Sequence, residues 1–191
     1  MSVLTFDALT HTYRYEGQVV PSVTQVLQPF YDFSMIPREV LERKRLIGEW
    51  THAGIELDLQ DNLDEDSIDD SWLGYFQGWR KFRNESGFVV QEAEQRVFST
   101  KYRVAGTLDL LGTLPKIGQA LIDTKTVAVT SPATGLQTAA YAELRGVQKA
   151  KRYGLQLRQN GTYELHPFAD RADFPTFLAA LTIFNWKKRN G

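Results

Sequence analysis

Two aspartates and a lysine are the residues of this chain whose types and spacing best suit chemistry on a phosphate. Asp109 interrupts a mostly apolar run at 107–111, and Asp123 interrupts a second run at 120–126. Lys125 follows Asp123 by two residues, and side chains alternate along a strand, so the two should project from one face. Carboxylates bind hard divalent cations, and an ammonium stabilises negative charge that develops on a phosphodiester.

The elements that must position these residues are two short strands joined by a Pro/Gly turn at 115–118. This pattern predicts a hairpin that brings Asp109 and Asp123 together. A carboxylate buried in a strand costs roughly several kcal/mol unless a partner such as a cation compensates it. The ordinary alternatives are a same-face ion pair between Asp123 and Lys125 and an aspartate that caps a turn.

Three further polar residues lie on predicted helices. His52 belongs to a helix expected over 37–57. Gln137 and Tyr141 are four residues apart on a helix expected from about 136 to 145, so they share one face. Either could reach a phosphate or orient a water molecule. The alternatives are a structural histidine, a surface glutamine and a core tyrosine.

The order of these elements resembles that of the PD-(D/E)xK nucleases, specifically the RecB-like exonuclease branch with compact phage and mitochondrial members. The matching elements are Gly48-x-x-x-His52, Asp109, Asp123-x-Lys125 and Gln137-x-x-x-Tyr141. The resemblance covers roughly residues 3 to 187 and implies one nuclease domain over 1–191. The implied fold is α/β, a restriction-endonuclease-like core with a mixed central β-sheet flanked by α-helices.

The resemblance also implies a division of roles within the site. One or two Mg²⁺ or Mn²⁺ ions are expected, and an imidazole among carboxylates suits Mn²⁺ at least as well as Mg²⁺. The implied metal ligands are His52, Asp109, Asp123 and the carbonyl of Thr124. The implied catalytic residues are Asp109, Asp123, Lys125, Gln137 and Tyr141.

Three residues form a second rank of candidates. Glu94 matches a glutamate that similar exonucleases often have before the Asp109 strand, and it is expected near the metal. Ser22 and Thr24 match a Ser-Val-Thr whose hydroxyls are expected near DNA. Ser22 and Gln25 also form a capping-box pattern, which predicts that Ser22 begins a helix.

The implied activity is divalent-metal-dependent hydrolysis of DNA, most simply by an exonuclease that processes ends in recombination, repair or replication. A structure-selective endonuclease and a catalytically inactive DNA-binding recombination accessory protein are the alternatives. DNA ends or single strands are the expected partner, together with a single-strand annealing or single-strand-binding protein. Polarity, strand preference and oligomeric state stay open.

Composition narrows these possibilities. The chain has 191 residues, 42% of them hydrophobic, and no cysteine, so thiolate catalysis and cysteine-bound iron–sulphur clusters are excluded. No apolar run is long enough for a membrane span, and no basic leader is visible, so we expect no membrane contact and a cytoplasmic location, in a bacterium or a phage-infected host.

Charge is divided unevenly along the chain. The net charge is −1, but residues 1–100 contain 9 Lys/Arg against 17 Asp/Glu, whereas residues 101–191 contain 13 against 6. A basic side suits contact with a phosphate backbone. An accident of solvated surfaces would give the same asymmetry.

The remaining pattern predicts helices at 72–84 and 172–187, strands at 88–90 and 96–99, and a hairpin around Asn160-Gly161. The acidic run at 58–71 is expected to be a solvated loop. The last helix is expected to bury six apolar side chains, namely Phe174, Phe177, Leu178, Leu181, Phe184 and Trp186.

Overall fold

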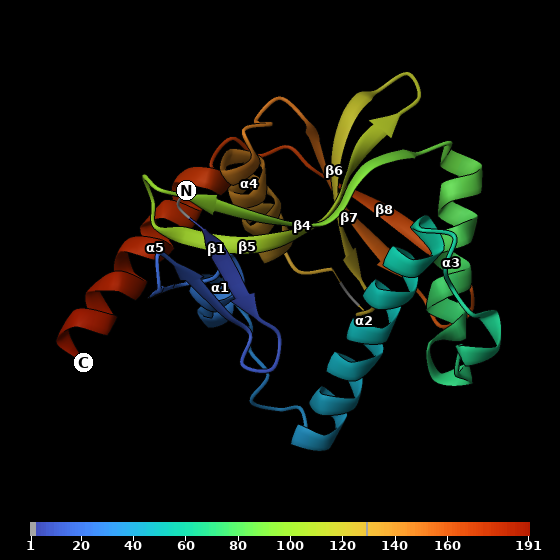
Figure 1. Cartoon of the computed structure of the whole chain (residues 1–191), viewed down its shortest axis with the longest axis horizontal. Coiled ribbons are helices and arrows are strands. Elements are labelled where there is room, and N and C mark those ends of the chain that lie inside the picture. Colours follow the sequence, from blue (N-terminus) through green and yellow to red (C-terminus); the bar gives the residue numbers. More distant parts are fainter. Residues whose placement is uncertain (1–2, 129) are drawn as a thin grey trace.

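The computed structural model describes residues 3–128 and 130–191 and has an α/β architecture (Figure 1). Its main sheet has five strands in the order β4-β5-β6-β7-β8, with helices on both faces. The strands are β4 (Val89–Ser99), β5 (Val104–Leu114), β6 (Gly118–Lys125), β7 (Lys151–Leu157) and β8 (Tyr163–Phe168). The helices are α1 (Val23–Leu27), α2 (Arg38–Leu59), α3 (Asp70–Ser86), α4 (Ala133–Arg145) and α5 (Asp173–Asn190), with 3₁₀ turns at Gln28–Phe30 and Glu65–Ser67.

The sheet is mixed, which confirms the predicted fold class. Strands β6 and β7 are parallel, and the other three neighbouring pairs are antiparallel. A parallel pair needs a long crossover connection, and α4 supplies it between β6 and β7. The crossover matters for the site because α4 carries Gln137 and Tyr141.

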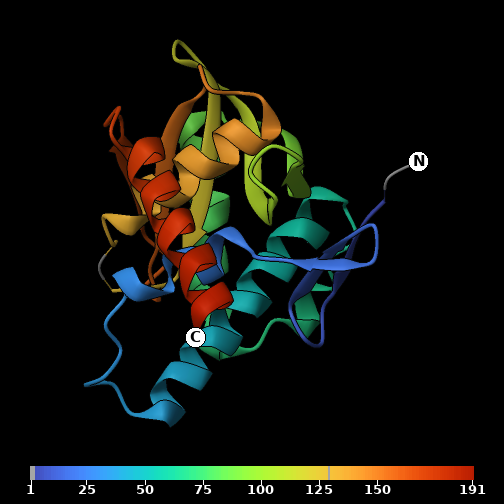
Figure 2. The ribbon, with the colours of Figure 1, turned by 90° about the vertical axis from the view of Figure 1, so that its left-hand side faces the viewer.

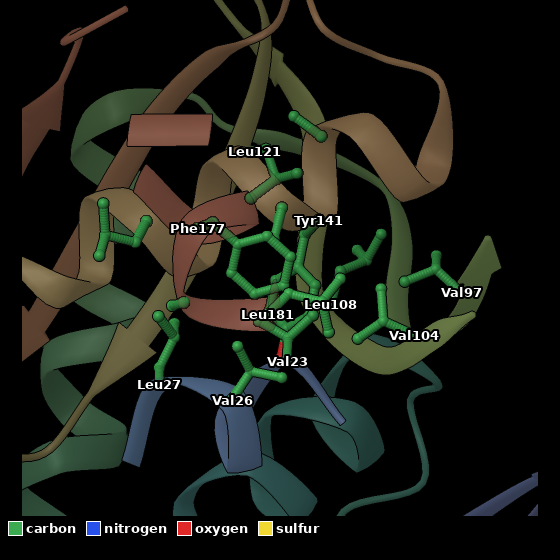
Figure 3. Close-up of a cluster of buried hydrophobic side chains, with 14 of the residues drawn as sticks. Val23, Val26, Leu27, Val97, Val104, Leu108, Leu121, Tyr141, Phe177 and Leu181 are labelled. Carbon is green, nitrogen blue, oxygen red and sulfur yellow. The ribbon is translucent and has the colours of Figure 1, made fainter. Parts of the chain in front are cut away.

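One face of the sheet is covered by α1, α4 and α5, of which α4 and α5 lie side by side (Figure 2). Leu108 and Leu121 from the sheet pack there against Tyr141 of α4 and Phe177 of α5 (Figure 3). The other face is covered by α2 and α3. Its core contains Phe76, Trp79 and Phe82 from α3 and Leu110, Ile122 and Leu155 from the sheet.

A second, three-stranded antiparallel sheet precedes α1 and consists of β1 (Leu4–Asp7), β2 (Thr12–Tyr15) and β3 (Gln18–Val20). Its buried residues Tyr13 and Val20 pack on Ala105 of β5. The chain then enters α1, whose first turn is capped by Ser22. The Ser22 hydroxyl accepts a hydrogen bond from the Gln25 amide, and the Gln25 side chain accepts one from the Ser22 amide, so the predicted capping box is confirmed.

Two sequence predictions about the surface were wrong. The acidic run at 58–71 is not simply a solvated loop, because Asp58 lies on α2 and accepts hydrogen bonds from Trp79 and Arg80. Trp186 was expected in the core, yet 59% of its surface is exposed. The last turns of α5 extend past the body of the protein (Figure 1), so an inward-facing position there has nothing to pack against.

The helices of the described residues include none long and apolar enough to cross a membrane.

Close packing of α3 on the β7–β8 hairpin generates a test of the fold. A Cβ at Gly74 would overlap the backbone carbonyl of Gln159, which cannot rotate away as a side chain could. We expect Gly74→Ala to lower the free energy of unfolding by roughly 1–3 kcal/mol in urea titrations. Gly48→Ala is the matched control, since its Cβ would sit 3.5 Å from Thr126 Oγ1, an ordinary contact. Alanine should stabilise that helix by about 0.5–1 kcal/mol, and equal effects of both substitutions would contradict the packing described.

Candidate metal centre

The candidate site lies where β5 and β6 stop pairing. Their ladder runs from Leu114↔Gly118 to Leu110↔Ile122 and ends there. Asp109 and Asp123 are the next residues of the two strands, and they are only 8% and 1% exposed. The predicted hairpin therefore brings the two carboxylates together in the interior of the sheet.

Asp109 is held by the residue that follows Asp123. The backbone amide of Thr124 donates to Asp109 Oδ2 at 2.7 Å, and the Thr124 hydroxyl donates to the same oxygen at 2.9 Å. Thr124 was predicted to contribute its carbonyl. That role of the carbonyl stays a prediction. The Thr124 amide and hydroxyl fix the orientation of the Asp109 carboxylate, a contribution that the sequence did not indicate.

His52 reaches this carboxylate from α2. Its Nε2 lies 3.0 Å from Thr124 Oγ1 and 3.8 Å from Asp109 Oδ2, and its Nδ1 lies 2.9 Å from Glu94 Oε1. One ligand atom from each of His52, Glu94 and Asp109 lies within 4.8 Å of the others. Such a spacing suits three ligands around one ion with bonds slightly longer than 2 Å, so this group could bind a metal.

Glu94 owes its position to an unusual backbone. It occupies β4 opposite Asp109, between the pairs Ala93↔Leu110 and Gln95↔Leu108, with a φ of +46°. A non-glycine residue with positive φ is uncommon, and such strain is concentrated at functional sites. The apolar alternation of β5 also changes here, since Leu108 packs in one core and Leu110 in the other. Glu94 thus belongs to the centre, whereas the sequence placed it in the second rank.

Asp123 starts a second chain of contacts. Its Oδ2 lies 2.7 Å from Lys125 Nζ, as the Asp-x-Lys spacing predicted. Lys125 donates to Gln137 Oε1 at 3.1 Å, and Gln137 Nε2 lies 3.5 Å from the Tyr141 hydroxyl. Gln137 and Tyr141 are 4% and 3% exposed, so both are interior groups.

The Tyr141 ring fits because β5 has a glycine beneath it. A Cβ at Gly106 would lie 2.6 Å from Tyr141 Cε1. Burial together with the nearby charges of Asp109 and Asp123 raises the pKa of Tyr141 well above its usual value, which keeps the phenol neutral. The predicted Gln-x-x-x-Tyr pair therefore supports Lys125 from the interior.

Burial and charge act against each other on the two acids. Burial raises the pKa of Asp123 to about 6, although Lys125 opposes the shift. Burial likewise raises the pKa of Asp109, which the positive charge of His52 opposes and Glu94 reinforces. Desolvation thus makes both carboxylates costly to ionise, and a positive charge between them would reverse that cost.

The two bases respond in the opposite sense. Burial disfavours the charged imidazolium of His52, but Asp109 and Glu94 outweigh this and raise its pKa to about 9. Burial also disfavours the ammonium of Lys125, and Asp123 with Asp109 outweighs it, so the pKa of Lys125 is raised. A bound cation would compete with the His52 proton, because imidazole binds metals in its neutral form.

One further observation supports the fit of these residues to a divalent cation. Asp123 Oδ1 is buried and has no hydrogen-bond partner among the described residues. Buried carboxylate oxygens are normally paired, so this oxygen is available as a ligand. Asp123 nevertheless stands outside the group of three converging ligands, in which Glu94 joins His52 and Asp109.

Other predicted residues have structural positions. Ser22 is 1% exposed and caps α1, and its Oγ lies 3.0 Å from Thr24 Oγ1.

Two tyrosines near the centre were not indicated by the sequence. The Tyr13 hydroxyl is hydrogen-bonded to Thr107 Oγ1 at 2.7 Å, and the charges of Glu94 and Asp109 act on it. The charges of Lys125 and Asp123 act on the Tyr31 hydroxyl. Neither lies in a motif, so no signal in the sequence could have found them.

Comparison of the chain with models of known protein families gives no match, and comparison with curated proteins likewise gives none. The resemblance to PD-(D/E)xK nucleases therefore stays a prediction that depends on the residues described above.

The geometry of Glu94 predicts a specific effect on metal affinity. Glu94→Gln removes a charged ligand but keeps nearly the same shape, so it should weaken Mn²⁺ binding by about tenfold or more in calorimetric titrations. Glu39→Gln is the matched control, since Glu39 is exposed in the first turn of α2. Equal Mn²⁺ affinity of both variants would exclude Glu94 from the centre.

The raised pKa of Asp123 predicts a pH dependence of the metal-free protein. The folded-state pKa of about 6 exceeds the ordinary value of 3.8, so the folded protein holds the Asp123 proton more tightly than the unfolded chain does. The contribution of Asp123 to the free energy of unfolding is therefore complete below pH 3.8 and is lost as pH rises through about 6. We expect the free energy of unfolding of wild type to fall relative to Asp123→Asn, by on the order of 2 kcal/mol from pH 4 to pH 7. Urea titrations in EDTA measure this difference. A difference that does not change with pH would contradict the burial cost assigned to Asp123.

Proposed function

We propose that this protein is a divalent-metal-dependent deoxyribonuclease that hydrolyses phosphodiester bonds. The observation that carries the proposal is the pair of buried carboxylates, Asp109 and Asp123, beyond the end of the β5–β6 ladder. Lys125 pairs with Asp123, and His52 lies beside Asp109. Two acids, an imidazole and an ammonium in one place suit metal-assisted phosphoryl chemistry.

The ligands of the proposed metal come from three elements. His52, Glu94 and Asp109 would hold Mg²⁺ or Mn²⁺, and Asp123 would contribute its unpaired Oδ1 to that ion or to a second one. The mixed nitrogen and oxygen donors favour Mn²⁺ at least as much as Mg²⁺. A bound ion would polarise the phosphodiester and neutralise charge that develops on its oxygens.

Lys125 has the position of an electrostatic stabiliser. Its ammonium pairs with Asp123 and is also held by Gln137, while 23% of the side chain is exposed to solvent and so is accessible to a substrate. The same charge would stabilise a pentacovalent phosphorane-like transition state. Gln137 and Tyr141 are buried behind it, so we assign them to positioning Lys125 and not to contacts with the phosphate.

Exonuclease action on DNA ends, in recombination, repair or replication, is the mode that the resemblance favours. The positive charge of residues 101–191 is consistent with contact to a phosphate backbone. A structure-selective endonuclease would use the same residues, and an accessory protein that binds DNA without cleaving it would need no ion. A single-strand annealing or single-strand-binding protein is the proposed companion.

The proposal predicts metal-dependent loss of DNA by the purified protein. End-labelled linear duplex, single strands and closed circles are incubated with Mg²⁺, Mn²⁺ or EDTA. We expect degradation with either ion, none in EDTA, and a loss of at least about a hundredfold in rate for Asp123→Asn and Lys125→Gln, because each removes a charge from the reacting region. Asp66→Asn, an exposed aspartate in the 3₁₀ turn Glu65–Ser67, is the matched control and should keep full activity.

The outcomes separate the alternatives. Loss of linear substrates alone supports an exonuclease, and the position of the label gives its polarity. Nicking of closed circles supports the endonuclease. Binding without cleavage under every ion, or full activity of Asp123→Asn, overturns the proposed enzyme.

A further inference from the structure

The linker between α1 and α2 contains three aromatic residues that the proposed chemistry does not use. Phe30 ends the 3₁₀ turn Gln28–Phe30, and Tyr31 and Phe33 follow it. The rings of Tyr31 and Phe33 are stacked, with centroids 5.8 Å apart and planes inclined by only 5°. Tyr31 packs against the hydrophobic core, whereas 49% of Phe33 is exposed. The inner ring therefore fixes the orientation of an outer ring that solvent can reach.

This ring pair approaches the candidate metal centre from the side of Tyr141. Tyr31 packs against the buried cluster that contains Tyr141, and Tyr141 is connected through Gln137 to Lys125. The charges of Lys125 and Asp123 also act on the Tyr31 hydroxyl, although burial is the main cause that raises its pKa. The linker also connects the two helices on either side of the centre, since α1 packs against α4 and α2 carries His52. Figure 1 shows it crossing from α1 to the start of α2, on the side toward which β6 runs.

An exposed aromatic ring, stacked on a tyrosine that senses the charges of a lysine and a carboxylate, suits one part of a nucleic acid in particular. Phosphates interact with the charges, but they gain little from a phenyl ring. Bases within a duplex have their faces covered by neighbouring pairs, whereas an unpaired base can stack on an aromatic side chain regardless of its identity. The combination of ring and charge thus matches a nucleotide of a single strand.

We infer that the exposed face of Phe33, held parallel to Tyr31, stacks on an unpaired nucleobase of the strand whose phosphate lies at Lys125, which makes the site selective for single-stranded over duplex DNA. This inference rests on the proposed nuclease function and specifies its substrate. Phe33 is a specificity determinant in this arrangement, and Tyr31 is the residue that positions it.

Phe30 provides a matched control three residues away. It is exposed to a similar extent, 46%, but it lines a separate apolar hollow between α1 and α5 together with Ile183 and Lys187. Replacing it removes the same ring from the same segment without touching the Tyr31–Phe33 stack. A difference between the two variants therefore reports the position of the ring and not a general loss of apolar surface.

The test compares kcat/KM of wild type, Phe33→Ala, Phe33→Leu, Phe33→Trp and Phe30→Ala on oligo(dT) and on blunt duplex, with Mn²⁺. We expect wild type to prefer oligo(dT). Phe33→Ala and Phe33→Leu should lower kcat/KM on oligo(dT) by about tenfold and on duplex by less than about twofold, because neither offers a π face. Phe33→Trp should keep full activity, as should Phe30→Ala. Circular dichroism melts check that each variant folds.

A substrate with one abasic site isolates the stacking contact. Moving that site along oligo(dT) should reveal one position at which wild type slows by about tenfold, while Phe33→Ala, which has already lost the contact, slows no further. Non-additivity at that position supports direct stacking.

Several results would overturn the inference while leaving the nuclease intact. These are equal activity of Phe33→Ala and Phe30→Ala on oligo(dT), equal losses on single and double strands, or full activity of Phe33→Leu. A wild-type preference for duplex would overturn it too, because Phe33 would then stack on the terminal base pair and not on an unpaired base. Absence of metal-dependent cleavage by wild type on every substrate would instead overturn the proposed function, and the inference with it.

Discussion

The burial of two neighbouring carboxylates inside the main sheet is the constraint on which the rest of the centre depends. Asp109 and Asp123 sit where β5 and β6 separate, and desolvation disfavours the charged form of each. The two residues that follow Asp123 supply both carboxylates with hydrogen-bond donors and a positive charge. Thr124 gives Asp109 an amide and a hydroxyl, and Lys125 gives Asp123 an ammonium. The local sequence Asp-Thr-Lys therefore serves both acids at once.

Without a bound ion, the surrounding groups compensate the desolvation of the two carboxylates only in part. His52 acts as an internal cation, since the carboxylates around it raise its pKa to about 9. Asp123 Oδ2 is ion-paired with Lys125, yet Asp123 Oδ1 has neither an ion-pair nor a hydrogen-bond partner among the described residues. A buried acid left in this state favours any cation that can enter. The fold adds the means to hold one, because α2 and the strained Glu94 approach Asp109 from two sides.

The two halves of the centre depend on different parts of the fold. The half that could bind a metal, with His52, Glu94 and Asp109, is built from α2, β4 and β5. The lysine half is built from β6 and the crossover helix α4, which is present because β7 runs parallel to β6. The two halves are in contact at Gly106 of β5, where the absence of a Cβ lets the Tyr141 ring of α4 pack against the strand. The position of Lys125 relative to His52, Glu94 and Asp109 therefore depends on contacts made by both halves.

What the sequence by itself determined were relations between residues close in the chain. Strand alternation placed Lys125 beside Asp123, helical periodicity placed Gln137 beside Tyr141, and the Ser22–Gln25 pattern predicted a cap that the structure has. The resemblance implied that Glu94 and His52 lie near one metal, but only the tertiary structure decided that they contact each other directly across 42 residues, from a position in β4 where Glu94 has a positive φ. Likewise, periodicity gave Trp186 an inward face, but whether a helix face has a partner depends on where the body of the protein ends. Short-range geometry is fixed by the backbone, whereas long-range contacts depend on strand register and packing, which no local pattern contains.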